Sequence, residues 1–363
     1  MLDIAIVGAG LSGLALAERL ADGHRNSALF DARNRYGGRI LTVRLANGLA
    51  ADLGPTWLWP AQQPRVSALC RRLNVPLFRQ ADTGLNLYQP SSGTRPLGYV
   101  DRQTHAGAYR IRGGCGALAD ALAAKLADTP LNLGWRLERV ADRGTHVTLA
   151  FAVNGSLQQI NARQAVLAIP PRLLAERVSF EPALPEQLAA ACQATPTWMA
   201  GHAKAAIGYP EAFWRSKGWS GNASAAYPGA ILAEIYDACD PQTASGALFG
   251  FFGIAPTLRE QYRAQLPNLI ASQLKALFGQ PAATPDSLQI QDWSRECFTA
   301  TDADRVPPAS HPDYGHRWLQ LDHWRDKLYF AGSETALEQG GYLEGALVAA
   351  ERVYAALALA TGS

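Results

Sequence analysis

The sequence predicts an α/β fold, and three observations support this class. Residues 3–13 form a short apolar run that breaks into glycines at Gly8, Gly10 and Gly13 and then continues with the composition of a helix. A second apolar run at residues 27–30 is followed by the acidic residue Asp31. The chain has 363 residues, 48% of them hydrophobic, enough for about two domains with sizeable cores. The opening segment therefore predicts the strand, glycine turn and helix that begin a Rossmann-type dinucleotide-binding domain.

The three glycines have separate roles in such a turn. Gly8 permits the tight turn, Gly10 keeps a Cβ out of the path of the phosphates, and Gly13 lets the helix lie close to the strand. The start of the helix then directs free N–H groups at the anion. Asp31 lies 18 residues beyond Gly13, where a carboxylate accepts hydrogen bonds from ribose hydroxyls. A βαβ unit that binds no nucleotide is the alternative interpretation.

Charge and cysteine content narrow the class of partner. The 33 basic and 31 acidic residues nearly cancel, so the chain lacks the field that gathers nucleic acid or an anionic membrane. No two cysteines have the spacing of a zinc or redox site. We therefore expect a reduced, cytoplasmic protein with a small-molecule partner and no metal. The first strand begins almost at Met1, and no apolar run reaches about 18 residues, so we expect neither a signal peptide nor a membrane span.

The middle of the chain predicts a mixture of helices and strands. A short helix is expected at residues 66–73, after a stretch rich in glycine, proline and tryptophan. Residues 86–111 indicate a hairpin, because prolines, serines and a glycine separate two apolar runs. A helix follows at residues 116–127. Further strands are expected at residues 131–140, 147–153, 165–169, 201–209 and 247–254.

The C-terminal part predicts two helices separated by a strand. Residues 258–278 have the spacing of an amphipathic helix, which Pro267 is expected to kink, and a loop follows at 280–287. Residues 328–331 predict a strand that leads into a glycine-containing turn. The last helix is expected to start near Tyr342, and its charged residues indicate a helix of a globular core.

Four separated blocks match one protein family in the same order. They are Val-Gly-Ala-Gly-Leu-Ser-Gly at 7–13, Asp-Ala-Arg-Asn-Arg-Tyr-Gly-Gly-Arg at 31–39, Ala-Asp-Leu-Gly-Pro-Thr-Trp at 51–57, and Phe-Ala-Gly-Ser-Glu-Thr at 330–335 with Gly-Gly-Tyr-Leu-Glu-Gly-Ala at 340–346. On these blocks the chain resembles the flavin-dependent amine oxidases of the monoamine and polyamine oxidase superfamily. The resemblance implies an FAD-binding domain at residues 1–75, 110–180 and 298–363. It also implies a discontinuous α+β substrate domain, built on a mixed sheet, at residues 76–109 and 181–297.

The resemblance implies FAD as the cofactor and assigns residues to it. Arg39 would place its guanidinium against the pyrophosphate, with a surface salt bridge as the alternative. Val140 matches a valine whose backbone contacts the adenine. No covalent link is expected, because residues 301–304 lack the cysteine of the mitochondrial members and Cys297 lies too close to Trp293 to be its equivalent. The assigned residues are Gly8, Gly10, Leu11, Ser12, Gly13, Asp31, Ala32, Arg33, Gly38, Arg39, Gly54, Pro55, Thr56, Val140, Gly332, Glu334, Gly341 and Tyr342.

The catalytic assignment rests on Lys204, which is followed downstream by Phe-Trp-Arg at 213–215. In the family a lysine at this place holds a water against flavin N5, whereas the residues alone favour an exposed position on an edge strand. Tyr342 matches one of two aromatic rings that flank the substrate amine, and Trp293 matches a tryptophan near the flavin. The second ring is left open among Trp57, Trp59, Trp293, Phe251 and Phe252, and Trp57 completes the expected catalytic set.

The expected function is the oxidation of an amine by hydride transfer to flavin N5. The imine is then hydrolysed, and O2 or another acceptor reoxidises the flavin. Between the early FAD segment and the turn at 113–116, family members usually insert a long helical block, and here only a hairpin-sized piece is present. The site is therefore expected to be open, or covered by a second copy of the chain. The alternatives are a desaturase or oxidase acting on C–C bonds, and a flavoprotein that modifies or matures a partner protein.

Overall fold

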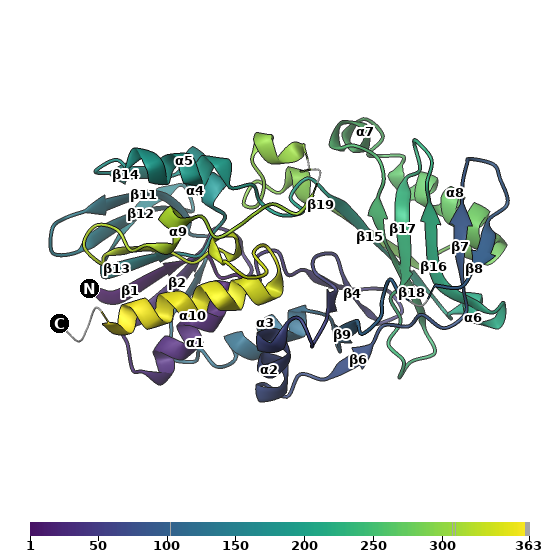
Figure 1. The fold of residues 1–363 in the computed structure, drawn as a ribbon, viewed down its shortest axis with the longest axis horizontal. Coiled ribbons are helices and arrows are strands. Elements are labelled where there is room, and N and C mark those ends of the chain that lie inside the picture. The colour runs from purple at the N-terminus through teal and green to yellow at the C-terminus, as the bar shows by residue number, and fades with distance from the viewer. Residues whose placement is uncertain (102, 307, 309, 360–363) are drawn as a thin grey trace.

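The computed structural model describes residues 1–101, 103–306, 308 and 310–359. These residues form two lobes, each built on its own large sheet (Figure 1). The first lobe contains the N-terminus, and the last helix ends beside it (Figure 1). The chain passes between the lobes several times.

The sheet of the first lobe has eight strands, seven of them in the order β10-β2-β1-β13-β12-β11-β14, while β20 pairs with β13. The strands β1, β2, β10, β13 and β20 are parallel, and β12 runs antiparallel to both of its neighbours. Val7 of β1 is paired with Phe30 of β2 and with Leu167 of β13. The carboxyl ends of these strands therefore meet at one edge, which is where open α/β sheets bind their ligands. The bounds are β1 Leu2–Val7, β2 Ser27–Asp31, β10 Leu131–Leu133, β11 Arg136–Asp142, β12 Val147–Val153, β13 Ser156–Leu167, β14 Ser179–Glu181 and β20 Leu328–Phe330.

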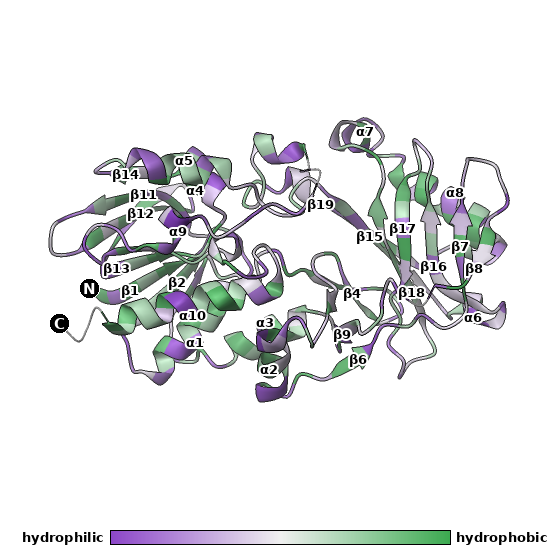
Figure 2. Cartoon of the chain, viewed as in Figure 1, coloured by the Kyte–Doolittle hydropathy of each residue, from purple (hydrophilic) through white to green (hydrophobic). Residues whose placement is uncertain are grey.

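Helices cover both faces of this sheet (Figure 1). Helices α1 and α10 lie against one face in a core that also takes in α2 and α3, and α4, α5 and α9 pack against the other. The strands of the first lobe are coloured largely as hydrophobic in Figure 2, as expected for a sheet that is buried on both faces. The bounds are α1 Leu11–Asp22, α2 Pro64–Arg72, α3 Gly116–Ala123, α4 Pro171–Arg177, α5 Glu186–Ala194, α9 Arg317–Gln320 and α10 Leu343–Leu359.

The second lobe is a mixed seven-stranded sheet in the order β19-β15-β18-β17-β16-β7-β8. All neighbouring pairs are antiparallel except β16 with β7. The amphipathic helix α8 packs its apolar side into the core of this lobe. The bounds are β7 Leu85–Gln89, β8 Leu97–Tyr99, β15 Ala203–Tyr209, β16 Trp219–Ala225, β17 Leu232–Asp237, β18 Gly246–Phe252, β19 Ser287–Asp292, α6 Phe213–Ser216, α7 Pro256–Gln261 and α8 Leu266–Phe278.

Short elements connect the two lobes. Strands β3 and β4 form a hairpin, and β9 pairs with both β5 and β6. Their bounds are β3 Thr42–Arg44, β4 Ala50–Asp52, β5 Trp57–Leu58, β6 Leu77–Arg79 and β9 Tyr109–Ile111. Short 3-10 helices lie at Gln280–Ala283, Trp293–Arg295, Asp302–Arg305 and Ser333–Thr335. Among the described helices, none combines the length and the apolar character needed to cross a bilayer.

Three details differ from the sequence predictions. The expected strand at 131–140 is two strands, because Gly134 adopts a φ of +76° and ends β10. The expected helix at 258–278 is not kinked but divided into α7 and α8, with Pro267 in the first turn of α8, where its missing N–H costs nothing. Residues 182–194 were expected in the second domain, yet Leu188 and Cys192 of α5 lie in the core of the first lobe. Of the expected FAD-binding segment 298–363, residues 307, 309 and 360–363 lie outside the described part.

Candidate functional site

One large cavity lies where the two lobes meet, and we call it the main cavity. Its wall is formed by the carboxyl edge of the first sheet, by the segment that precedes β5 and by strand β15 of the second lobe. Most of the predicted site residues line it: Gly8, Gly10, Leu11, Ser12, Asp31, Arg33, Gly38, Arg39, Gly54, Pro55, Thr56, Trp57, Lys204, Trp293, Gly332, Gly341 and Tyr342. The structure therefore brings together residues more than 300 positions apart in the chain.

The glycine turn has the geometry that a dinucleotide requires. Gly8 has a φ of +105°, and an added Cβ would lie 2.4 Å from the carbonyl oxygen of Ala168. A Cβ on Gly13 would lie 1.9 Å from the carbonyl oxygen of Gly8, so α1 can pack this closely on β1 only with glycine there. At Gly10 the nearest atom to an added Cβ is 3.9 Å away, so this side of the turn is open toward the cavity. Gly13 itself shapes the turn and does not line the wall.

The carboxylate of Asp31 is fixed beside this turn. Its two oxygens accept hydrogen bonds from the backbone N–H groups of Ala9 and Arg33, both at 2.9 Å. The side chain is buried, yet it contributes to the cavity wall. A rigid, desolvated carboxylate at the end of β2 fits the hydroxyls of a ribose.

Arg39 makes an internal ion pair. Its guanidinium lies 2.6 Å from the carboxylate of Glu334 and donates to Ser333 Oγ at 2.9 Å. Glu334 is fully buried and does not line the cavity, whereas Arg39 does. Burial disfavours the charged guanidinium, but the Glu334 carboxylate outweighs it, so the pKa of Arg39 is raised. A cation at this place, anchored from behind, fits the charge of a pyrophosphate.

The backbone contact with the adenine that the resemblance assigns to Val140 stays a prediction. The side chain of Val140 is fully buried in the core of the first lobe and does not line the main cavity. A smaller side cavity adjoins the main cavity and shares Gly8, Asp31 and Arg33 with it. Its wall contains Ala32, Leu137 and Glu138. A bulge in β11 lies between Leu137 and Arg139, at the strand that contributes to this wall.

Lys204 lies on β15 with only 2% of its surface exposed, so the edge-strand alternative is wrong. Its Nζ donates to the carbonyl oxygen of Gly54 at 3.0 Å and to the hydroxyl of Thr56, and it lies 4.1 Å from the ring centre of Phe249. No carboxylate of the described residues is within ion-pair distance. Burial lowers the pKa of Lys204 to about 7, and the Asp52 carboxylate offsets only part of this effect. The amine is therefore poised to gain or lose a proton near neutral pH.

The tryptophans of the expected catalytic set are held by their indole N–H groups. Trp57 donates to Gln80 Oε1 at 2.8 Å, and Trp293 donates to the carbonyl oxygen of Leu53 at 2.9 Å. Trp59 and Phe251 also line the main cavity. Phe252 does not, because it points into the core of the second lobe.

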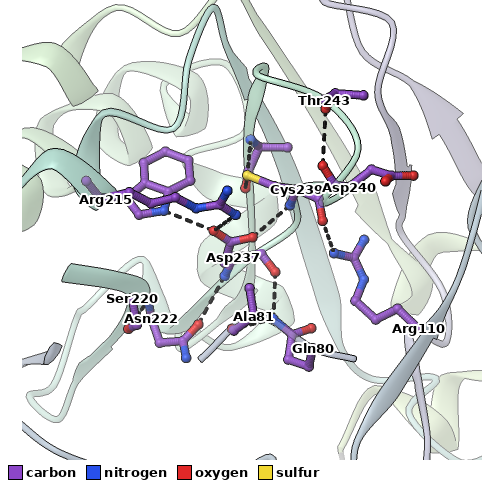
Figure 3. A network of polar contacts seen from close by, with 12 residues as sticks. Gln80, Ala81, Arg110, Arg215, Ser220, Asn222, Asp237, Cys239, Asp240 and Thr243 are labelled. Carbon is purple, nitrogen blue, oxygen red and sulfur yellow. Dashed lines mark hydrogen bonds and ion pairs between the residues drawn. The ribbon is translucent and has the colours of Figure 1, made fainter. Parts of the chain in front are cut away.

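The anchor of Trp57 belongs to a polar network inside the second lobe. The Nε2 of Gln80 donates to the carbonyl oxygen of Asp237, and the Asp237 carboxylate accepts from Arg215 and from the backbone N–H of Cys239 (Figure 3). Asp237 is fully buried, so its charge depends on these donors. Arg110 donates to the carbonyl oxygen of Cys239 in the same network (Figure 3). The family motif Phe-Trp-Arg thus serves structure here, since Arg215 lines no wall of the main cavity.

Tyr342 belongs to a group of rings that the sequence analysis did not identify. The imidazole of His311 stacks on it at 4.8 Å and an interplanar angle of 2°, and the indole of Trp198 meets it at 6.2 Å and 61°. Trp198, Met199 and His202 line the main cavity, and so does Phe298. Burial lowers the pKa of His202, so a neutral imidazole faces the cavity. The segment that contains Trp198 carries no repeated motif, and only its position before the lysine strand could have drawn attention to it.

The residues present fit an FAD. The open glycine turn, the fixed carboxylate of Asp31 and the anchored cation of Arg39 follow one another along a wall that continues to Lys204. Among the described residues, no group of three histidine, cysteine or acidic side chains gathers closely enough to hold a metal ion.

Comparison with known proteins agrees with this fit. Residues 84–357 match the family of flavin-containing amine oxidoreductases, and residues 6–73 match a NAD(P)-binding Rossmann-like domain. AofH of Mycobacterium tuberculosis, a protein assigned to the flavin-containing monoamine oxidases, is 27% identical over 459 residues, which cover 98% of this chain and 96% of that protein. Human flavin-containing amine oxidase B is 24% identical over 96% of this chain and 85% of its own length. The alignments are longer than the 363 residues of this chain, so these relatives carry additional segments.

Solved structures show the same fold. Putrescine oxidase bound to putrescine has a TM-score of 0.79 at 20% identity over 98% of each chain. The cyclohexylamine oxidase of Brevibacterium oxydans has a TM-score of 0.79 at 18% identity over the whole of both chains. Because the family match spans most of the chain and the cavity fits its cofactor, this protein belongs to the flavin-containing amine oxidoreductases and is an FAD-dependent oxidoreductase.

Proposed function

We propose that this protein oxidises an amine by removing a hydride from the carbon next to a neutral nitrogen, and that Lys204 serves the proton transfers. Bound FAD supplies the electron acceptor at N5. The amine becomes an imine, which water hydrolyses, and O2 takes up the electrons and is released as H2O2. The observation that carries the proposal is a lysine that is almost fully buried in the cavity wall and has only neutral oxygens as partners.

The chain contributes positioning and proton transfer. Trp57 and Trp293 are rigid because their N–H groups are bound, so they provide fixed walls that exclude water. With a pKa of about 7, Lys204 can take a proton from a water in the cavity and return it. Tyr342 presents a partly exposed aromatic ring in the cavity wall, and a ring face accepts a nearby ammonium group.

We further propose that the FAD is held without a covalent bond. The thiol of Cys297 lies in the side cavity with Leu137 and Glu138, at the end where the adenine is expected, and not in the main cavity. Acid precipitation of the purified protein should therefore leave all of the yellow colour in the supernatant. Colour that remains with the precipitated protein would contradict a non-covalent link.

The test of the function is anaerobic mixing of the yellow protein with separate amines. We expect loss of the flavin absorbance near 450 nm with at least one class of amine, and H2O2 after air is admitted. Bleaching by substrates without nitrogen would favour the reaction on C–C bonds. Bleaching only in the presence of a macromolecule would favour action on a partner protein. A colourless protein that takes up no added FAD would overturn the assignment of the site.

A further inference from the structure

The segment between α5 and β15 places Trp198 in the main cavity. Trp198 and Met199 line the cavity, and Lys204 follows six positions later on the strand that this segment enters. The resemblance assigned no role to this segment. A large indole in the wall of a substrate site is either a packing residue or a determinant of which ligand fits.

The backbone immediately before Trp198 is fixed by two contacts. The hydroxyl of Tyr314 donates to the carbonyl oxygen of Pro196 at 2.9 Å, and the buried carboxylate of Asp304 accepts from the N–H of Thr197 at 3.0 Å. Met199 has a φ of +62°, a conformation that side-chain-bearing residues rarely adopt. Because methionine is not favoured in this conformation, the surrounding contacts must impose it.

The indole itself is enclosed by neighbouring groups. An added Cβ at Gly341 would lie 2.7 Å from Trp198 Cβ, so the absence of a side chain at Gly341 is what lets Trp198 approach. The indole is 4.6 Å from the ring of His311, at 62°, and 6.2 Å from that of Tyr342. The His311 ring is in turn held by a hydrogen bond from Nε2 to the carbonyl oxygen of Gly340 at 2.9 Å. Trp198 therefore cannot turn aside without breaking up the group of three rings.

Trp57 and Trp293, which also line the main cavity, are held through their indole N–H groups, whereas no described residue holds Trp198 in this way. The indole N–H groups of Trp57, Trp214 and Trp293 all have acceptors in the protein. Trp198 is half-buried, and among the described residues its N–H has no acceptor. The ring of Trp198 is therefore held by its packing against Gly341 and its ring neighbours, and it lines the cavity without a hydrogen bond of its N–H to the described part of the protein.

Trp198 contacts two residues, His311 and Tyr342, that line a cavity next to the main cavity. A third, more polar outer cavity shares Trp59, Gln63 and Tyr342 with the main cavity. Its wall also contains His311, which contacts Trp198. A ligand that enters from this outer cavity passes Tyr342, the ring that Trp198 touches.

We propose that Trp198 is a specificity-determining residue that restricts the site to slender amines, unbranched at the carbon that bears the nitrogen. The proposal rests on the proposed amine oxidation. We expect the fixed indole next to Tyr342 to obstruct a second substituent on that carbon, whereas a linear chain can lie along the ring faces. Such steric selection by a few carbon atoms amounts to about ten- to two-hundredfold in enzymes.

The test compares butylamine isomers in the flavin-loaded parent and in Trp198→Ala. In the parent we expect kcat/KM for n-butylamine to exceed that for sec-butylamine. In Trp198→Ala we expect the ratio to move toward sec-butylamine by about tenfold, mainly through KM. Trp198→Phe keeps an aromatic ring, so it should fold if the alanine variant does not, and should show a smaller shift. Trp318→Phe, in a half-buried tryptophan that lines no wall of the main cavity, is the matched control and should behave as the parent.

A binding measurement separates this proposal from the proposed function. tert-Butylamine has no hydrogen on the carbon next to nitrogen, so it cannot be oxidised, but its binding perturbs the flavin spectrum. We expect it to bind about tenfold more tightly to Trp198→Ala than to the parent. Unchanged tert-butylamine affinity and an unchanged isomer ratio in both Trp198 variants, with full flavin content, would overturn the role of Trp198. A parent flavin that no amine reduces would instead refute the proposed function, and the titration would still report on Trp198.

Discussion

At the level of single residues, the buried Lys204 separates this cavity from an ordinary nucleotide-binding cleft. Its pKa of about 7 means that Nζ is mainly charged below this pH and mainly neutral above it. The family resemblance identified the residue, and the structure supplies the reason for its reactivity, which is burial without an acidic partner. Burial of this kind depends on β18 and on the segment before β5, so residue 204 and its neighbours in the sequence could not have revealed it.

We expect Lys204→Met to retain FAD but to slow flavin turnover by about a hundredfold or more. In the parent, the proton-accepting step should speed up as the pH rises through about 7, because the neutral amine is then formed. The variant should lack this pH dependence. Stopped-flow reduction and reoxidation between pH 5.5 and 9 measure both effects, with Lys217→Met, at an exposed position, as the control. If Lys204→Met is reoxidised and turns over like the parent, Lys204 has no role in the mechanism.

Substitutions in the Arg39–Glu334 ion pair should distinguish effects on FAD affinity from effects on protein stability. Arg39→Gln should weaken FAD binding and also lower the free energy of unfolding by about 3 kcal/mol, because Glu334 is left as an unpaired buried charge. In the double variant with Glu334→Gln, stability should largely return while FAD affinity stays low. Flavin titration and urea denaturation measure the two quantities. Full recovery of FAD affinity in the double variant would show that Arg39 does not contact the cofactor.

At the level of elements, the turn between β1 and α1 gives a matched pair of substitutions. Gly10→Ala meets no atom of the protein closer than 3.9 Å, so the apoprotein should melt as the parent apoprotein does, but the added methyl group should exclude FAD. Gly13→Ala would collide with the Gly8 carbonyl, so it should lower the melting temperature of the apoprotein as well. Thermal melts with and without FAD distinguish the two. Normal flavin content in Gly10→Ala would show that the FAD phosphates do not bind against this turn.

Elements with a strong local signal could be predicted, whereas those that depend on distant contacts could not. The glycine turn, β12 and the last helix follow from apolar spacing and glycine placement, and they occur where expected. The strand β19 has polar residues at alternate positions and is only half-buried, so its pairing with β15 cannot be recognised from its own sequence. In the site, Trp198 and Phe298 are brought to the cavity by segments without a motif, which is why sequence analysis left the second aromatic ring open.

At the level of the whole molecule, the cavity wall connects the two lobes. Asp31 and Arg39 come from the first lobe and its connections, and Lys204 comes from the second. A ligand that contacts both lobes stabilises them together, by about 2.7 kcal/mol when free ligand is at a hundred times Kd. We therefore expect removal of FAD to lower the melting temperature and to separate one cooperative transition into two. Calorimetry of holo- and apoprotein tests this, and a single unchanged transition would show that the lobes do not depend on the cofactor.

The expectation that a second copy of the chain covers the site stays a prediction. The hairpin of β7 and β8 is the piece found where family members usually insert a helical block, and it exposes Leu85, Leu97 and Tyr99 to solvent. Sedimentation of the holoprotein, compared with that of Leu97→Asn, measures whether this surface mediates self-association. A monomer at all concentrations would leave the hairpin as an exposed flank of an open site.

Residues from both ends of the sequence line the main cavity, and this affects when FAD can bind during synthesis of the chain. The Gly8 turn is synthesised first, yet the hydroxyl of Ser12 in α1 is bound to the carbonyl oxygen of Ala331, and Gly332 and Tyr342 complete the same cavity. The nascent chain on the ribosome therefore lacks one side of the main cavity until residues 331–342 have been synthesised. We therefore expect FAD to bind only after residues 331–342 have been synthesised.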